Sequence, residues 1–136
     1  VMTMAYQQRK IGFVGTPDTN PETKPFFDAA AQGRFVVPTC GSCGKAHWYP
    51  RGICPHCFSQ KLEWKTASGK GTIYSFSVMK RTEVPYCIAY VTLQEGATML
   101  TNIVDCDLDS VRIGQPVQVK FVPSEGGPPL PMFTPA

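Results

Sequence analysis

The second half of the chain consists of short runs in which apolar and polar residues alternate, the pattern of half-buried β-strands. Turn-forming residues separate the runs, and Gln94-Glu95-Gly96 in particular predicts a hairpin between the second and third strands. Strands of this length joined by glycine-containing turns are typical of a small closed or nearly closed barrel, because a sandwich usually has more strands. The predicted strands are 72–79, 86–93, 97–104 and 117–122.

The apolar positions of these strands form the expected interior of the barrel. Cys87 and Cys106 lie among them and are most simply explained as core residues. The proline-rich stretch 126–131 is expected to form neither a helix nor a central strand, because proline lacks the N–H that both require. The interior candidates are Ile73, Val78, Ile88, Val91, Leu93, Leu100, Ile103, Val104, Val117 and Val119.

The segment 20–34 has apolar residues at helical spacing instead. Asn20 is suited to cap a helix, Pro21 to its first position, and Gly33 to its C-terminal end. We therefore predict a short amphipathic helix within 20–34, preceded by a flexible arm at 1–19 that shows no useful periodicity. The apolar stripe consists of Phe26, Phe27, Ala30 and Ala31.

The region 35–67 joins this helix to the barrel region 68–136, and Gly69-Lys70-Gly71 marks the hinge between the two. The region 35–67 contains two Cys-x-x-Cys pairs flanked by short apolar segments. These segments predict strands that enter the first pair, return to the second and leave it again, at 35–38, 47–51 and 62–65.

The two cysteine pairs have the spacing of a zinc ribbon. Each pair lets a tight turn direct both sulfurs at one centre, and two facing turns supply the four thiolates of a closed tetrahedral Zn²⁺ site. Glycines at such turns tolerate the positive φ that the backbone needs around the sulfurs. The predicted ligands are Cys40, Cys43, Cys54 and Cys57, and the metal is expected to be structural.

Other uses of these cysteines stay open at this point. Two disulfides would be typical of a small secreted chain, and nothing here resembles a signal peptide. A redox Cys-x-x-Cys would be expected once and near a βαβ pattern, whereas an iron site of the rubredoxin type has nearly the same spacing. His47 and His56 could each replace a cysteine, but they are not chosen as ligands, because His56 should face away from the metal.

Composition narrows the classes of function. A net charge of +3 is far from the dense Lys/Arg stripe of a dedicated nucleic-acid binder. No stretch approaches the roughly 18 consecutive apolar residues of a membrane-spanning helix. Six cysteines without a secretory leader indicate a reducing cytoplasm.

The chain also shows no convincing catalytic set. A nucleophile needs an activating base, and both histidines lie in or beside the cysteine pairs. Four thiolate ligands leave zinc no open position for a reacting water. The chain alone is therefore expected not to be an enzyme, but a protein that helps another one work.

Several motifs together resemble a known family, the bacterial and archaeal zinc-ribbon plus OB-fold proteins called domain of unknown function thirty-five. The likeness covers nearly all of residues 20–135 and implies an N-terminal helix, a rubredoxin-like zinc ribbon and a five-stranded OB-fold barrel. The matching motifs, in order, are Cys40-Gly41-x-Cys43-Gly44, Tyr49-Pro50-Arg51-x-x-Cys54-Pro55-x-Cys57, Ser68-Gly69-x-Gly71-Thr72-Ile73-Tyr74-Ser75, Pro85-Tyr86 and Ile113-Gly114-Gln115-Pro116-Val117.

The resemblance implies a non-catalytic accessory subunit. Members of the family form hetero-oligomers with thiolase-like enzymes, including thiolases, retro-aldolases that cleave steroid or other side chains, and acyltransferases. Others associate with hotdog-fold hydratases. By resemblance, this chain would stabilise a thiolase-like partner that acts on acyl-CoA thioesters, and would share the coenzyme A path with it.

Two further residue assignments follow. Phe26 and Phe27 either cover the chain's own core or dock on the partner, and the second hypothesis makes them candidate partner-binding residues. The Lys and Arg residues scattered along the chain could bind the phosphates of coenzyme A, or they could simply keep the chain soluble. Arg51 is chosen as the cofactor-binding candidate because a ribbon hairpin would fix it between the two cysteine turns.

A different class of function remains as an alternative. Zinc ribbons and OB barrels also occur in proteins that bind single-stranded nucleic acids by stacking bases on exposed aromatic rings above a basic groove. The strands carry few Lys/Arg, and the acidic turn 105–109 would repel phosphate. The rings that could form such a platform are Tyr74, Phe76, Tyr86 and Tyr90.

Overall fold

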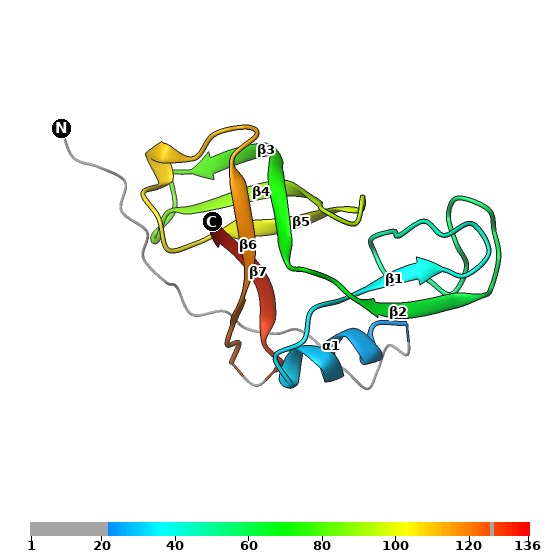
Figure 1. Ribbon diagram of the computed structural model, residues 1–136. Coiled ribbons are helices and arrows are strands. Elements are labelled where there is room, and N and C mark those ends of the chain that lie inside the picture. Colours follow the sequence, from blue (N-terminus) through cyan, green and yellow to red (C-terminus); the bar gives the residue numbers. More distant parts are fainter. Residues whose placement is uncertain (1–21, 126) are drawn as a thin grey trace.

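The computed structural model describes residues 22–125 and 127–136 (Figure 1). The arm predicted at 1–19 lies outside the described residues, as does the start of the segment predicted to be helical. In chain order the elements are α1 (Lys24–Ala31), β1 (Val36–Cys40), β2 (Leu62–Thr66), β3 (Lys70–Met79), β4 (Tyr86–Leu93), β5 (Thr98–Ile103), η2 (Leu108–Ser110), β6 (Pro116–Val122) and β7 (Leu130–Pro135).

Helix α1 is short because its sequence limits it at both ends. Pro25 occupies the first turn, where its missing N–H costs nothing. Gly33 has a positive φ of 76° and donates from its amide to the carbonyl of Ala30, which ends the helix. The predicted helix is therefore present.

The ribbon is built on one antiparallel pair of strands. β1 and β2 pair from Val36 with Thr66 to Cys40 with Leu62, so the strands predicted around 35–38 and 62–65 are confirmed. The strand predicted at 47–51 is wrong: the one isolated bridge nearby joins Thr39 to Ala46, just before this segment. Beyond it the chain turns toward α1, where Trp48 packs on Phe26 with ring centroids 4.9 Å apart instead of alternating along a sheet.

The remaining strands close into a barrel in the order β3-β4-β5-β7-β6. β3 pairs with β4 along its length and meets β6 only near its start, from Lys70 with Gln118 to Thr72 with Pro116. The β5–β7 contact is parallel, and the other contacts in the barrel are antiparallel. The four predicted barrel strands are confirmed, and the structure is the expected five-stranded OB-fold barrel.

β7 contradicts the expectation for the proline-rich stretch 126–131 at its last two residues, because Leu130 and Pro131 begin this strand between β5 and β6. The carbonyl of Phe133 accepts a hydrogen bond from the amide of Val104 on the β5 side. Because backbone groups alternate along a strand, Pro131 and Pro135 also face β5. On that side β7 has a single pair, Ile103 with Phe133, so the missing N–H groups remove few ladder bonds. The ladder with β6 runs along all of β7.

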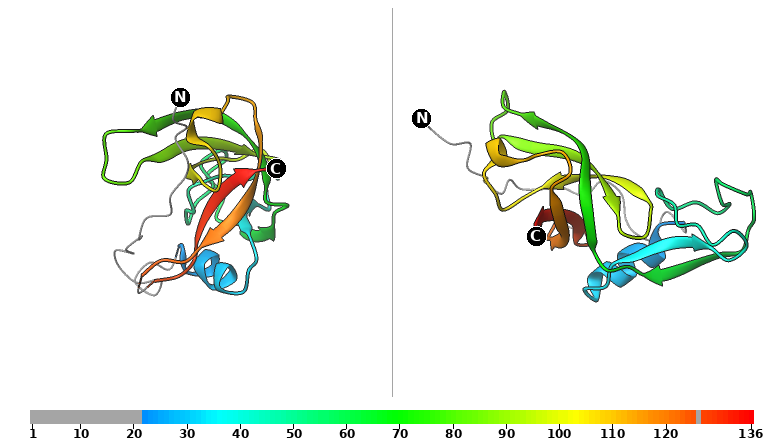
Figure 2. Two further views of the ribbon diagram at one scale, coloured as in Figure 1. Left: turned by 90° about the vertical axis from the view of Figure 1, so that its left-hand side faces the viewer. Right: turned by 45° about the horizontal axis from the view of Figure 1, so that its top comes forward.

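One apolar core joins the three parts of the chain. Phe35, between α1 and β1, packs edge to face on Phe133 of β7, and Phe26 of α1 contacts Phe35 in the same way. Figure 2 shows α1 alongside the ribbon strands and below the barrel. Because helix, ribbon and barrel share buried side chains, the position of the ribbon on the barrel is fixed by packing.

The register of the barrel corrects part of the predicted interior. Val91 pairs with Met99 inside the barrel, whereas Tyr90 pairs with Leu100 on the outside, where Leu100 is 55% exposed. Ile88 has the outward parity of Tyr90 and is only half-buried. Leu100 and Ile88 are therefore not core residues, since alternation places them on the outer face. The other eight candidates are buried or packed against the core.

Candidate metal centre and the groove beside it

The four predicted cysteines converge at one end of the ribbon. Their sulfurs all lie within 4.8 Å of one another, with Cys40 and Cys57 3.5 Å apart and Cys43 and Cys54 3.7 Å apart. Tetrahedral zinc with bonds of about 2.3 Å to sulfur would separate the sulfurs by about 3.8 Å, so the cluster fits the ion. All six cysteines are free thiols, so the structure does not support the disulfide alternative.

Backbone amides prepare the sulfurs for a cation. Ser42 and Cys43 both donate to Sγ of Cys40, and the amide of His56 donates to Sγ of Cys54. The Cys43 amide is the main reason that the pKa of the Cys40 thiol falls to about 6, although burial opposes the shift. Because metal ligands must be thiolates, these donors favour binding of the ion.

The pKa of Cys57, whose sulfur faces that of Cys40, shifts in the opposite direction. The Ser59 amide alone would lower the pKa of Cys57, but the hydrogen-bonded sulfur of Cys40 and burial raise it to about 11. Because zinc binds the thiolate, a bound Zn²⁺ would displace the proton of Cys57. Among the described residues the ligand cluster contains these four cysteines and no histidine. When bound, zinc would supply folding free energy to a segment with little core of its own.

The two cysteine turns have the same backbone. We call residues 40–44 the first knuckle and residues 54–58 the second knuckle. The amide of Gly44 donates to the carbonyl of Cys40 at 2.9 Å, and the amide of Phe58 donates to that of Cys54 at the same distance. Both donor residues have positive φ, 74° for Gly44 and 65° for Phe58. The second knuckle thus holds a phenylalanine where the first has glycine.

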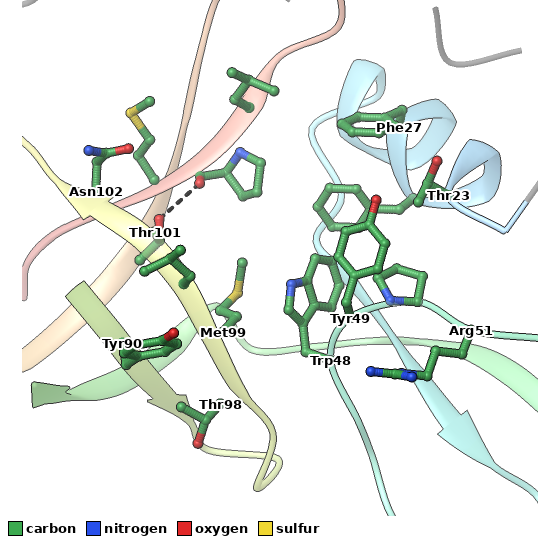
Figure 3. Close-up of a pocket in the computed structure, with 16 residues that line it drawn as sticks. Thr23, Phe27, Trp48, Tyr49, Arg51, Tyr90, Thr98, Met99, Thr101 and Asn102 are labelled. Atoms are coloured by element: carbon green, nitrogen blue, oxygen red, sulfur yellow. Dashed lines mark hydrogen bonds between the residues drawn. The ribbon is translucent and has the colours of Figure 1, made fainter. Parts of the chain in front are cut away.

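A groove of about 550 Å³ lies between the ribbon with its helix and the outer side of the barrel. Figure 3 shows Phe27, Trp48 and Tyr49 on one side and Tyr90 and Met99 on the other. The lining is mainly apolar, and Arg51 is its one charged residue in the described part of the chain. The groove therefore has mainly apolar walls and one cationic side chain at its edge.

The three residues predicted to bind the cofactor or the partner differ in their exposure. Arg51 is exposed, lines the groove and makes no ion pair with a described residue, so it is available to an anion. Phe26 is 2% exposed and lies within the core, whereas Phe27 is half-buried and lines the groove. The roles of all three in binding stay predictions, and of the two phenylalanines Phe27 has the more accessible ring.

Sequence reasoning did not find the barrel wall of the groove. Tyr90 and Leu100 line it as a cross-strand pair on the outer face, although Leu100 was expected inside. The pattern that could have shown this is the strict alternation of β4, in which Cys87, Ala89 and Val91 are buried. Large apolar residues on the opposite parity would then have indicated a second, external apolar surface.

His47 was considered as a metal ligand and lies in the core instead. Its side chain is 3% exposed, and neither ring nitrogen has a partner among the described residues. Burial lowers the pKa of His47, and nearby His56 and Arg51 lower it further, so its ring is neutral near neutral pH. None of the helices in the described part of the chain is long and apolar enough to cross a bilayer, as the sequence predicts.

Two family descriptions match the chain in succession. "ChsH2, rubredoxin-like zinc ribbon domain" matches residues 27–63, and "ChsH2, C-terminal OB-fold domain" matches residues 64–122. A DUF35 domain-containing scaffold protein of Methanothermobacter thermautotrophicus is 43% identical over 89 residues, which cover 60% of this chain and 67% of that protein. A probable enoyl-CoA hydratase alpha subunit of Thermomonospora curvata is 35% identical over 88% of this chain, which spans only 39% of that protein.

A solved structure agrees with both descriptions. A chain of the Ltp2-ChsH2(DUF35) aldolase superposes with a TM-score of 0.75 at 34% identity, covering 85% of this chain and 95% of its own length. The order of helix, cysteine cluster and closed barrel is thus matched by sequence and by structure. The chain belongs to the DUF35/ChsH2 family of rubredoxin-like zinc ribbons joined to an OB-fold barrel.

Proposed function

We propose that the chain is a non-catalytic accessory subunit of a thiolase-like enzyme that acts on acyl-CoA thioesters. The observation that carries this proposal is the similarity over 95% of a chain in the Ltp2-ChsH2(DUF35) aldolase. A second relative is named benzoylsuccinyl-CoA thiolase subunit BbsA, from Geobacter metallireducens, and is 27% identical over 62% of this chain. In this proposal the chain stabilises its partner and contributes one wall of the coenzyme A path.

The groove supports a role in that path. Coenzyme A combines a long, narrow pantetheine arm with phosphates, and the groove combines apolar walls with the exposed Arg51. A guanidinium can pair with phosphate through two parallel hydrogen bonds, which a lysine cannot do. Arg51 would hold a phosphate at the edge of the groove, and Phe27 and Leu100 would face the arm or the partner that covers it.

The same groove supports an accessory role over a catalytic one. Its described lining contains no cysteine, histidine or carboxylate, so it offers neither an activated nucleophile nor a general base. The cysteine cluster does not supply the missing group, because four thiolates would close the coordination of zinc. The chemical step is therefore assigned to the partner.

A hydratase partner is the second candidate. Besides the Thermomonospora protein, a relative from Mycobacterium tuberculosis is named 3-oxo-4,17-pregnadiene-20-carboxyl-CoA hydratase alpha subunit and is 35% identical over 69 residues. This chain spans only 22% of that protein. The similarity supports association with a hydratase, while the hydration chemistry of these relatives is not carried over to this chain.

The nucleic-acid alternative gains little from the structure. Tyr74 and Tyr90 are exposed on the barrel, as stacking would require. However, two of the barrel cations are paired with carboxylates, Lys80 with Asp109 and Lys120 with Asp105. These two cations are therefore neutralised by carboxylates and contribute little to the positive groove that a phosphate backbone needs.

The test begins with the natural partner. The zinc-loaded chain is purified with its partner from its native cells, the partner is identified by mass spectrometry, and both are then prepared separately. We expect no turnover of an acyl-CoA thioester by the chain alone and full activity only for the complex. A partner that is neither thiolase-like nor a hydratase, or activity of the pure chain, would contradict the proposal.

Arg51→Gln in the reconstituted complex tests the coenzyme A path. Loss of a phosphate contact made equally in ground and transition states should raise KM roughly three- to tenfold and leave kcat nearly unchanged. The matched control is Lys65→Gln on the exposed side of β2, which should leave both constants unchanged. An unaltered KM in the Arg51 variant would remove this residue from the path.

A further inference from the structure

Phe58 occupies a backbone position that is unfavourable for it. The residue that follows each knuckle has the left-handed conformation, in which glycine has no Cβ to clash with the backbone. Gly44 satisfies this requirement in the first knuckle. Phe58 adopts the same conformation with a bulky side chain, although the hydrogen bond that it makes is identical to that of Gly44.

The side chain of Phe58 gains no packing that could offset this. It is 78% exposed, the largest exposure among the exposed large apolar residues that the structure describes. It makes no ring contact within the described chain and lies outside the hydrophobic core. A residue that is unfavourable both in backbone conformation and in solvation is typical of a functional surface.

Phe58 does not stand alone on this surface. It lines a shallow hollow of about 620 Å³ together with Ile53, which is 47% exposed, and with Arg51, Pro55 and Glu22. We call Arg51, Ile53, Pro55 and Phe58 the knuckle tip. It comprises part of the second knuckle and residues just before it, and Arg51 connects it to the groove that is proposed to hold coenzyme A.

The charges around the tip indicate the kind of surface that fits it. Residues 35–67 contain four cations and one carboxylate, Glu63, but of these cations only Arg51 lines the hollow, and Glu22 adds a carboxylate to its lining. A complementary surface has an apolar pocket for an aromatic ring and a carboxylate opposite the exposed Arg51. The four cations are Lys45, Arg51, Lys61 and Lys65.

We propose that Phe58 of the knuckle tip inserts into an apolar pocket of the thiolase-like partner subunit, with a partner carboxylate facing Arg51, and anchors the complex there. The inference rests on the proposed function for the identity of the partner, and it assigns the contact to the second knuckle. A single buried aromatic residue can contribute a large share of the binding free energy of an interface. Burial of Phe58 in the complex would therefore offset its unfavourable conformation and exposure in the free chain. Arg51 would pair with the partner carboxylate at the edge of this pocket and help to orient the two subunits.

The test compares wild type with Phe58→Gly, which gives the second knuckle the residue of the first. Both proteins are zinc-loaded, their zinc content is measured, and the Kd for the purified thiolase-like subunit is determined by calorimetric titration. We expect the variant to keep its zinc, to unfold at an equal or higher temperature, and to bind at least tenfold more weakly. The control is Ile113→Gly, which removes a similarly exposed apolar side chain, 70% exposed, from the barrel and should leave Kd unchanged.

Each other result overturns the inference in a distinguishable way. An unchanged Kd for Phe58→Gly, with wild type binding the thiolase-like subunit, refutes the anchor and leaves the proposed function intact. A lower unfolding temperature or lost zinc would show that Phe58 supports the fold. Absence of binding by wild type refutes the proposed function together with the anchor. Binding of a single-stranded oligonucleotide that depends on Phe58 would assign the tip to nucleic acid instead.

Discussion

The first knuckle, Cys40–Gly44, and the second, Cys54–Phe58, close with the same hydrogen bond and the same sign of φ, yet they present different surfaces. At the closing position, Gly44 has no side chain, and an added Cβ would meet no atom within 4 Å. Phe58 exposes most of a ring at the equivalent position. The comparison teaches that zinc geometry determines the backbone of a knuckle and leaves the side chain open to selection for another purpose.

The sulfurs show a second difference. In the first knuckle the buried Cys40 receives amide hydrogen bonds from both Ser42 and Cys43. In the second, the buried Cys54 receives one from His56 and Cys57 receives one from Ser59, but Cys57 is exposed. The first knuckle is thus the better shielded half of the metal site, and the second is the half that faces solvent or a partner.

The largest effect should come from removing a ligand, and it should be equal in both knuckles. Cys43→Ser and Cys54→Ser each leave three thiolates, and zinc binding is worth about 10–16 kcal/mol in isolated zinc-finger peptides. We expect both variants to lose the metal and most hydrogen-exchange protection in residues 36–66, while much of the barrel is retained. Metal analysis with exchange mass spectrometry checks this. Zinc retained by only one variant would show that the knuckles contribute unequally.

A smaller effect is expected from giving the first knuckle the residue of the second. Gly44→Phe forces a side chain into the left-handed region without a clash at its Cβ, so we expect mainly the conformational cost, about 1–2 kcal/mol. Denaturant unfolding of the zinc-loaded protein measures it. Gly52→Ala is the matched control, since that glycine lacks positive φ and its added Cβ would have one neighbour at 3.9 Å. Equal stability of Gly44→Phe and wild type would contradict the strain assigned to Phe58.

The smallest effect is expected in the second knuckle itself. Asparagine tolerates the left-handed conformation better than phenylalanine does, so Phe58→Asn should recover part of its cost, roughly 0.5 kcal/mol. The same denaturant experiment measures the gain in the isolated chain. A loss of stability would mean that the exposed ring makes a favourable contact within the chain, and the comparison of the two knuckles would then fail.

The sequence predicts those parts of the molecule that depend on local spacing. The Cys-x-x-Cys pairs place four sulfurs together because a two-residue turn is short enough to determine its own geometry. The alternation in β4 and β5 likewise predicts both strands. The same alternation leaves open which parity faces inward, and Leu100 was assigned to the wrong face because that depends on pairing with Tyr90.

Features that depend on distant partners could not be predicted. The segment 47–51 has the residues of a strand, but Trp48 packs on Phe26, which lies more than twenty positions away in sequence. Phe58 and Arg51 acquire their shared hollow only when the second knuckle folds over the cysteine cluster. The αL conformation of Phe58 has no sequence pattern of its own, because its residue type disfavours it.

The position of β7 has a consequence for how the chain is made. This strand lies between β5 and β6, and Phe133 contacts Phe35 near the start of the ribbon, almost a hundred residues earlier. Until residues 130–135 leave the ribosome, β6 is joined to the rest of the barrel only through its short pairing with β3. Closure is therefore a late, long-range step, and the growing chain would expose the edges of β5 and β6 during synthesis. Early contact with a partner or a chaperone would protect these edges at the time when the nascent chain is most prone to aggregate.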